Sequence, residues 1–301
     1  MSANEAKRDR ALPLWRSLLY VPVTSEKFVE KAHERGADGI KLDLEDSIAL
    51  SEKPRARTMV RDAAKVVGKG GADVLVRVNR PWRMLMADLE ASIWPEVGGI
   101  CLPKVDSAEL IEFVDEAVGE LEIERGIEPG TTRYMVLIET PRGYANARAI
   151  AHASPRIDGI TLGQEDFCAA MGMRTESSFL IPYMQQIAVC AREAGVLPIG
   201  YPGSIVDFTD LDAFRASAEK ARALGFEGGS AIHPRQVDVL NQAFMPTDQE
   251  LDWSEGVVAA YDKALAEGVG AVTYEGKMID VPVVERGRHM LAIRDKIQAR
   301  G

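Results

Sequence analysis

The middle of the chain reads Tyr134-Met-Val-Leu-Ile-Glu139-Thr140 and, a little further on, Gly159-Ile-Thr-Leu-Gly163-Gln164-Glu165-Asp166-Phe167. Both are short apolar runs that lead into carboxylates, and such runs are typical of buried strands in a parallel sheet. The carboxyl ends of neighbouring parallel strands meet at one rim, so we expect Glu139 and Asp166 to lie together there. Two carboxylates in such a place can hold a magnesium ion.

Similar apolar runs recur along the chain, at residues 17–21, 39–44, 74–79, 99–103, 134–139, 159–163, 197–201 and 228–232. Stretches with helical spacing lie between them, such as residues 26–35, 53–67, 108–120, 142–151, 178–194 and 210–224. Regular alternation of strands and helices predicts a parallel sheet, and eight units predict its closure into a (β/α)8 TIM barrel over residues 14–245.

The rival architecture is an open, doubly wound sheet. Such a sheet usually carries a glycine-rich nucleotide loop after its first strand, whereas this chain has Val21-Pro22-Val23-Thr24-Ser25-Glu26. Residues 246–301 remain beyond the barrel and contain helical patterns at 248–266 and 283–299. We expect this C-terminal helical extension to cover the barrel mouth as a lid or to pack on a neighbouring subunit.

Composition narrows the range of functions. The chain has 301 residues, of which 46% are hydrophobic, as in a globular protein with a large core. Its formal charge of −10, without a cluster of Lys and Arg, argues against binding to nucleic acid. No apolar run approaches the roughly 20 residues needed to span a bilayer, so no membrane partner is expected. Three widely spaced cysteines lack the spacing of a zinc or disulfide framework, and we expect a cytoplasmic location.

The residues at the strand ends favour a hard metal ion and an anionic substrate. No His or Cys accompanies Glu139 and Asp166, so Mg²⁺, or alternatively Mn²⁺, fits better than zinc. Arg77 alternates with Val76 and Val78 and is expected to point inward, where a lone charge is costly. It would therefore clamp a small-molecule carboxylate substrate.

Each of these assignments has a structural alternative. Glu139 could cap the following helix or pair with a lysine, and Arg77 could form an ion pair with Glu45 or Asp46. Lys104 is a weak candidate for a Schiff-base nucleophile, because nothing near it in the sequence argues for a lowered pKa. His233, where the last strand turns into a helix, is expected to be a hydrogen-bonded structural residue.

The order of several motifs resembles the citrate lyase β-subunit (CitE-like) branch of the HpcH/HpaI aldolase family, which includes malyl-CoA and citramalyl-CoA lyases. The resemblance runs from Arg16 to Ile297. It is carried by Arg16-Ser-Leu-Leu-Tyr-Val-Pro, Leu42-Asp-Leu-Glu-Asp-Ser-Ile, Lys53-Pro-Arg-Ala-Arg, Val76-Arg-Val-Asn, Leu102-Pro-Lys-Val, Leu137-Ile-Glu-Thr, Leu162-Gly-Gln-Glu-Asp-Phe, Ala231-Ile-His-Pro-Arg-Gln and Met278-Ile-Asp.

This resemblance implies a barrel, trimeric or hexameric, that binds Mg²⁺ and cleaves a carbon–carbon bond in a 3-hydroxyacyl-CoA through an enolate. By position, Glu139 and Asp166 resemble the family's metal ligands, and Arg77 resembles its clamp for the substrate carboxylate and carbonyl. Glu45 and Asp46 resemble an acidic pair that orders metal-bound water or substrate near the rim.

Further expectations concern the two ends of the chain. Asp280 resembles an aspartate that a neighbouring subunit delivers for proton transfer, although its place before Val281-Pro282 also suits a helix N-cap. Arg16, Lys27 and Lys53 are candidates for contacts with the CoA phosphates.

The chain also departs from the family pattern. Val23 stands where a glycine is common, and Gly200 lies where many members carry an aspartate. A metal-dependent aldolase or thioesterase on a related hydroxy or oxo acid, and a lyase subunit that depends on partners, therefore stay open as alternatives.

Overall fold

A computed structural model describes residues 11–205 and 209–300. The chain divides into two compact units, of which the first ends at Phe244 and the second begins at Met245. The first unit contains the predicted barrel and the residues at the strand ends.

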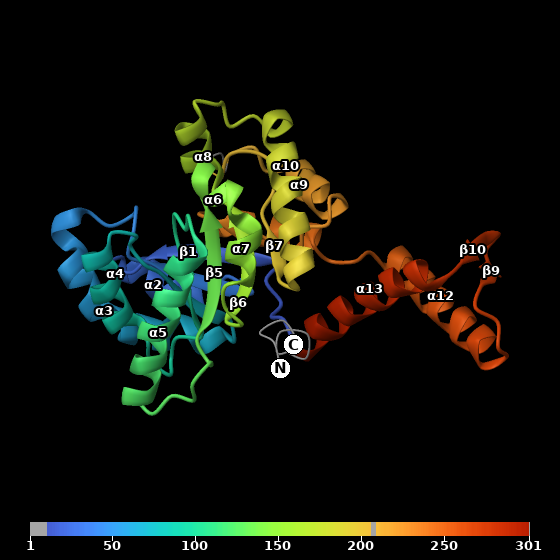
Figure 1. Ribbon diagram of the computed structural model, residues 1–301, viewed down its shortest axis with the longest axis horizontal. Coiled ribbons are helices and arrows are strands. Elements are labelled where there is room, and N and C mark those ends of the chain that lie inside the picture. The colour runs from blue at the N-terminus through green and yellow to red at the C-terminus, as the bar shows by residue number, and fades with distance from the viewer. Residues whose placement is uncertain (1–10, 206–208, 301) are drawn as a thin grey trace. The chain divides into compact units, whose positions relative to one another are not determined.

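The first unit is built on parallel strands that alternate with helices (Figure 1). Its strands are β1 (Ser17–Pro22), β2 (Gly39–Asp43), β3 (Asp73–Arg77), β4 (Gly99–Leu102), β5 (Arg133–Ile138), β6 (Ile157–Leu162), β7 (Leu197–Ile199) and β8 (Gly229–Ala231). Neighbours in sequence pair from β1 to β7, and β8 pairs with β1. A parallel bridge between Ile199 and Gly228 links β7 to the start of β8. The eight predicted strands are thus confirmed, in a nearly closed (β/α)8 barrel.

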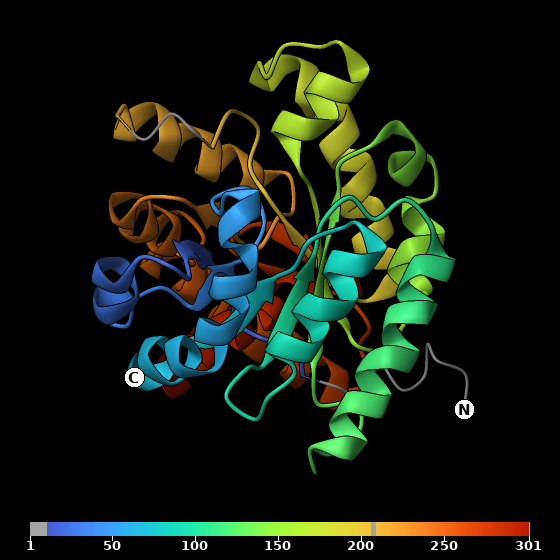
Figure 2. The ribbon, with the colours of Figure 1, turned by 90° about the vertical axis from the view of Figure 1, so that its left-hand side faces the viewer.

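Helices follow the strands and cover their outer faces (Figure 2). They are α2 (Glu26–Ala32), α3 (Lys53–Val67), α4 (Trp82–Ser92), α5 (Ala108–Glu124), α6 (Pro141–Ala145), α7 (Ala147–His152), α8 (Gln164–Met171), α9 (Ser177–Ala194), α10 (Leu211–Ala223) and α11 (Pro234–Ala243). The helix expected over residues 142–151 is interrupted at Asn146, whose side chain donates to the carbonyl of Asp106 at 2.9 Å.

Helix α8 differs from the prediction in a way that matters for the site. The sequence places Gln164, Glu165 and Asp166 at the end of a strand, but β6 stops at Leu162 and these residues form the first turn of α8. Acidic side chains are favourable in a first turn, because the helix N-terminus carries a partial positive charge. Asp166 is therefore positioned by a helix and not by a strand.

Apolar side chains form two separate cores in the barrel unit. The larger one lies between the strands and the helices, with residues such as Ile40, Leu42 and Ile160. The smaller one fills the barrel interior and contains Trp15, Leu18, Leu75, Cys101, Met135, Leu137, Leu197 and Ile199. Strand residues alternate between these cores because successive side chains of a strand point to opposite faces. The smaller core fills the barrel interior, and polar residues lie at the carboxyl ends of the strands.

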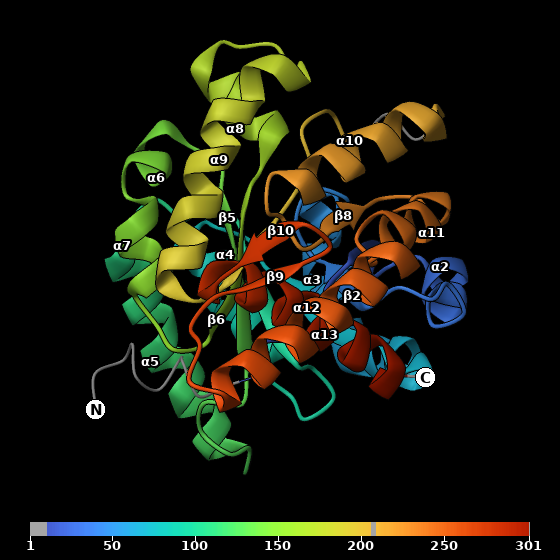
Figure 3. The same cartoon turned by 90° about the vertical axis from the view of Figure 1, so that its right-hand side faces the viewer.

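The second unit consists of two long helices and a hairpin (Figure 3). Its elements are α12 (Asp248–Ala266), β9 (Val272–Tyr274), β10 (Lys277–Ile279) and α13 (Val281–Arg300). Thr247 and Glu250 form a reciprocal capping box that starts α12. Val257, Tyr261, Ile279 and Val284 form the buried core of this unit. The two helices were expected, whereas the antiparallel hairpin was not.

The helices in the described part of the chain include none that is both long and apolar enough to cross a membrane.

Candidate functional site

A cavity of about 460 Å³ lies at the carboxyl ends of the barrel strands. Its polar lining comes from β2, β3, β5 and the start of α8, and includes Asp43, Asp46, Arg77, Glu139 and Asp166. Its other walls include Leu137, Thr161, Gly200, Tyr201, Ile205 and Ile232. The structure therefore brings Glu139, Asp166, Arg77 and Asp46 to one hollow, as the sequence predicts.

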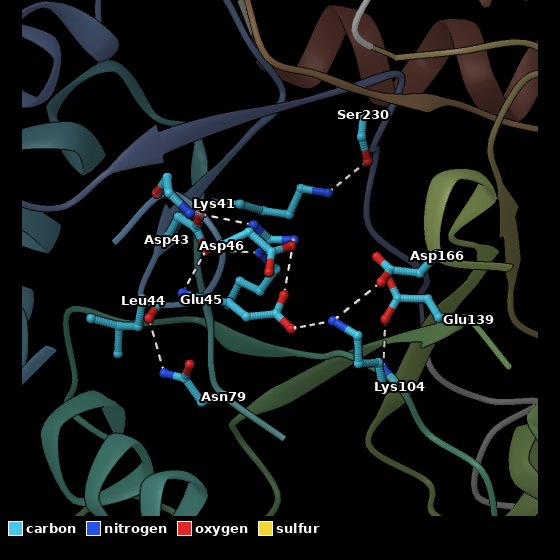
Figure 4. Close-up of polar contacts among 12 residues, drawn as sticks. Lys41, Asp43, Leu44, Glu45, Asp46, Asn79, Lys104, Glu139, Asp166 and Ser230 are labelled. Carbon is cyan, nitrogen blue, oxygen red and sulfur yellow. Dashed lines mark hydrogen bonds and ion pairs between the residues drawn. The ribbon is translucent and has the colours of Figure 1, made fainter. Parts of the chain in front are cut away.

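Glu139 follows β5 and is only 4% exposed. Its Oε2 atom accepts a 2.6 Å hydrogen bond from the backbone N–H of Lys104, which fixes the carboxylate at the rim. Asp166 lies near it, on the next strand-to-helix connection (Figure 4). A buried carboxylate with one oxygen held by a backbone donor has its other oxygen available for a cation.

The ammonium group of Lys104 is a cation held by two other carboxylates of this cluster. Its Nζ atom lies 2.9 Å from Glu45 Oε1 and 3.5 Å from Asp166 Oδ1 (Figure 4). Burial lowers the pKa of Lys104, but the hydrogen bond and charge of Glu45 outweigh this and raise it above the usual value. Because the amine stays protonated, the geometry disfavours Lys104 as a Schiff-base nucleophile.

Gly163 makes room for Glu139. A Cβ atom at Gly163 would lie 2.3 Å from Cγ of Glu139 and 2.4 Å from its Oε1. Any side chain at position 163 would therefore push the Glu139 carboxylate out of its place. The sequence contains this glycine at the end of a strand but gives no sign that it accommodates a side chain from the neighbouring strand.

Arg77 is held rigidly by acidic residues from β2 and the loop after it. Its Nε and Nη2 atoms donate to the two oxygens of Asp43 at 2.7 and 2.8 Å. Its Nη1 atom lies 3.0 Å from Glu45 Oε2 and 3.2 Å from Asp46 Oδ2. The ion-pair alternative considered for Arg77 is therefore present, and Asp43, which the sequence did not single out, is its principal partner.

Burial shapes the electrostatics of the site. It raises the pKa of Glu139 to about 7, with a contribution from the nearby charge of Glu45. It also raises the pKa of Glu45 itself. The pKa of Asp43 moves the other way, because hydrogen bonding and the charge of Arg77 overcome the effect of burial. The negative charge of Glu139 is thus only partly balanced by its surroundings, whereas the negative charge of Asp43 is balanced by Arg77.

This arrangement fits a magnesium ion. Among residues 11–205 and 209–300, no group of three or more His, Cys, Asp and Glu side chains is arranged to hold a metal, so a cage made wholly of protein ligands is excluded there. Mg²⁺ usually takes one or two carboxylates and completes its shell with water and substrate oxygens. Glu139 and Asp166 supply that number, and the ammonium of Lys104 shows that a positive charge is accommodated beside them.

Three basic residues predicted to meet CoA lie in different places. Arg16 precedes β1, at the opposite end of the barrel, where its Nε and Nη2 atoms pair with Asp38 at 2.8 and 2.9 Å. The Nζ atom of Lys53 is buried and donates to the carbonyls of Leu44 and Glu45, both at 2.8 Å. Both cations are therefore bound to groups of the barrel itself. Lys27 is exposed in the first turn of α2, which follows β1.

The remaining predicted residues are His233 and Asp280. His233 caps α11 by accepting from the backbone N–H of Arg235 at 3.2 Å, and Gln236 completes the capping box, in keeping with a structural role. Asp280 belongs to the second unit, where its carbonyl accepts from the first turn of α13. Its side chain is half-buried.

Residues 16–234 match the protein family described as HpcH/HpaI aldolase/citrate lyase. The citrate lyase subunit beta of Escherichia coli (strain K12) is 37% identical over 284 residues, which cover 92% of each chain. The L-malyl-CoA/beta-methylmalyl-CoA lyase of Rhodobacter capsulatus is 33% identical over 294 residues, covering 90% of this chain and 92% of the lyase.

Solved structures show the same similarity. The protein CitE of Mycobacterium tuberculosis, solved in complex with magnesium, acetoacetate and coenzyme A, superimposes with a TM-score of 0.71 at 28% identity. The match covers 94% of this chain and 98% of that protein.

Replacing Gly163 by alanine should weaken Mg²⁺ binding by about tenfold or more, because the new Cβ displaces the Glu139 carboxylate. Calorimetric titration with Mg²⁺ measures this effect. Gly119→Ala is the matched control, since the nearest atom to a Cβ there is 3.9 Å away. Equal Mg²⁺ affinity in both variants would contradict the proposed place of Glu139 in the metal site.

Mg²⁺ affinity should also depend on pH. The pKa of Glu139 is raised to about 7, so below this pH the metal must displace a proton from the folded protein. We expect the apparent affinity to fall by about tenfold per pH unit below pH 7 and to level off above it. The increase in melting temperature caused by Mg²⁺ should accordingly be larger at about pH 8 than at about pH 6. A pH-independent increase would show that Glu139 does not bind the ion.

Proposed function

The chain belongs to the HpcH/HpaI aldolase/citrate lyase family and is a carbon–carbon lyase, and we propose that it cleaves a 3-hydroxyacyl-CoA of the malyl-CoA, citramalyl-CoA or citryl type with Mg²⁺ as cofactor. The observation that carries this proposal is the cavity in which Glu139 and Asp166 lie together with Arg77. Mn²⁺ would suit the same oxygen ligands. The free, buried state of Cys101, Cys168 and Cys190 is in keeping with a reaction in the cytoplasm.

Glu139 and Asp166 are the residues that would hold the metal. When bound, Mg²⁺ supplies positive charge to the oxygen on which negative charge develops as the carbon–carbon bond breaks. Leu137 and Tyr201 give this part of the cavity wall an apolar surface. Lys104 would release Asp166 when the cation enters and keep its bond to Glu45.

Arg77 would hold the carboxylate of the substrate. Its guanidinium is fixed by Asp43 before any substrate arrives, so little conformational freedom is lost on binding. The Nη1 atom is shared between Glu45 and Asp46, and the Asp46 side chain is 59% exposed. We assign Glu45 and Asp46 to the ordering of water or substrate beside it.

Asp280 would transfer the proton, delivered from the C-terminal unit of a neighbouring subunit in a trimer or hexamer. It lies between the β9–β10 hairpin and α13. Met278 and Val281 beside it are 71% and 49% exposed, and apolar side chains so placed favour packing against another surface. A unit that carries Asp280 on such a surface can act as a lid on a barrel mouth.

The proposal that CoA is used depends on the relatives more than on the basic residues. Arg16 and Lys53 are engaged in the fold, so of the three predicted phosphate contacts Lys27, which is exposed in the first turn of α2, is kept as the candidate. Val23 is fully buried and apolar, so it does not supply a contact with a CoA phosphate. Gly200 lines the cavity and, having no side chain, supplies no charged group there.

Incubation with malyl-, citramalyl- and citryl-CoA in the presence of Mg²⁺ should release a 2-oxo acid and a shorter acyl-CoA, both measurable by mass spectrometry. Asp166→Asn should lower this turnover by about 10²-fold or more, because a metal ligand is lost. Asp212→Asn, which changes an exposed aspartate in the first turn of α10, is the matched control.

The products distinguish the alternatives. Free CoA without a 2-oxo acid would identify a thioesterase, and cleavage of free hydroxy acids alone would identify an aldolase. Turnover only after addition of partner subunits would identify a dependent lyase subunit. No turnover of any of these thioesters with Mg²⁺ present would end the lyase proposal.

Asp280→Asn alone should reduce turnover more than substrate binding. Co-expression of the Asp280→Asn and Arg77→Lys variants should restore about a quarter of wild-type activity, because a site between subunits is intact when a normal barrel (about 1/2) meets a normal C-terminal unit (about 1/2). If Asp280 served its own barrel, no chain in the mixture would be intact and no activity would return. Unchanged turnover in the single Asp280 variant would remove its catalytic role.

A further inference from the structure

Lys41 is a fully buried lysine inside the barrel that the proposed chemistry does not use. It lies on β2 and is 0% exposed. Its Nζ atom donates to Ser230 Oγ at 2.6 Å, lies 3.9 Å from the sulfur of Met135 and is 3.8 Å from the centre of the Tyr20 ring. None of the contacts found for it within residues 11–205 and 209–300 is an ion pair with a carboxylate. A buried ammonium in such surroundings is costly for the fold.

This charge lies directly beneath the cavity. Ser230 and Tyr20 both line the cavity, and Lys41 reaches Ser230 from below (Figure 4). An ammonium group can only donate hydrogen bonds, so Ser230 Oγ must accept from Lys41. The hydroxyl hydrogen of Ser230 is then left to donate to a cavity occupant, and the adjacent positive charge strengthens that bond.

The cavity needs such a charge to hold an anion. Its described lining has the acidic residues Asp43, Asp46, Glu139, Glu165 and Asp166, whereas Arg77 is the basic residue in the same lining. Arg77 is already balanced by Asp43, Glu45 and Asp46. The Tyr20 ring is close to both cations: its centroid lies 4.6 Å from the Arg77 guanidinium and 3.8 Å from Lys41 Nζ.

We propose that Lys41, acting through Ser230, makes the floor of the cavity an anion-binding site for the carboxylate of a 2-oxo acid, which it holds together with Arg77. The choice of a 2-oxo acid rests on the proposed function, whereas the preference for an anion follows from the contacts of Lys41. Lys41 is a positioning residue, and Ser230 is the group that touches the ligand. A bound carboxylate neutralises the buried positive charge of Lys41.

Pyruvate and its uncharged methyl ester, each titrated by calorimetry at saturating Mg²⁺, test this inference. Lys41→Met retains the volume of the side chain and should weaken pyruvate binding by about tenfold or more. Affinity for the methyl ester, and for Mg²⁺ alone, should change by less than about twofold. Ser230→Ala should weaken pyruvate binding several-fold, whereas Thr161→Val, which alters another cavity hydroxyl, should not.

The pH dependence supplies a readout that a purely structural role would not give. Burial lowers the pKa of Lys41 to about 8, so pyruvate affinity should fall above pH 8 in the wild type and stay flat in Lys41→Met. The groups that face Lys41 are Tyr20, Asp43, Arg77, Cys101 and Glu139. Burial raises the pKa of Cys101 to about 11 and that of Tyr20 well above its ordinary value, so both stay neutral near pH 8. Glu139, with a pKa of about 7, is present in the wild type and in Lys41→Met alike, so the comparison between them isolates the contribution of Lys41.

The outcomes separate this inference from the proposed function. A wild type that binds the ester as tightly as pyruvate, or a Lys41→Met variant that keeps the preference for pyruvate, overturns the inference even if thioesters are cleaved. Should Lys41→Met fail to fold, unchanged pyruvate affinity in Ser230→Ala overturns it instead. Absence of cleavage with the charge preference intact removes the proposed lyase function and leaves the anion site.

Discussion

The buried carboxylate of Glu139 is the constraint around which the mouth of the barrel is organised. Taking a carboxylate out of water is unfavourable unless nearby groups compensate for it. The protein supplies one backbone donor from Lys104, a space left by Gly163 and a lysine ammonium among the neighbouring acidic groups. The compensation is incomplete, as the raised pKa of Glu139 shows. An added divalent cation would complete it, which links the energetics of the fold to the chemistry of the site.

Two kinds of charged residue surround this carboxylate. Arg77 and Asp43 form a closed pair with matching geometry, and they gain rigidity from it. Glu139 and Lys41, in contrast, are buried without full partners, and their pKa values shift toward the neutral forms. Paired groups hold the cavity in shape, and unpaired groups gain most from a ligand. The cavity is therefore prepared for a cation on one wall and for an anion on its floor.

The barrel could be predicted from the sequence because each strand is a compact apolar run between helical stretches. Glu139 and Asp166 could be brought together because parallel strands place their carboxyl ends at one rim. The role of Gly163 could not be predicted, because it depends on the missing side chain, whose space the Glu139 side chain after the neighbouring strand fills. The role of Lys41 and the ion pairs of Lys104 could not be predicted for a related reason: their partners, Ser230 and Glu45, are distant in sequence. Lys53 looked like a surface cation, but its amine bonds to backbone carbonyls that only the folded chain brings near.

The position of Lys104 has a consequence for the life of the protein between reactions. Its backbone is in a left-handed conformation, with φ of 50°, and from there the side chain extends to Glu45 and Asp166. The Lys104 ammonium reduces the repulsion between these carboxylates while no metal ion is bound. If the metal binds Glu139 and Asp166 as proposed, its entry would require the Lys104 side chain to move away from Asp166 and no refolding of the barrel. Such a lysine would let newly made chains reach their final shape in a cell where the metal is momentarily scarce.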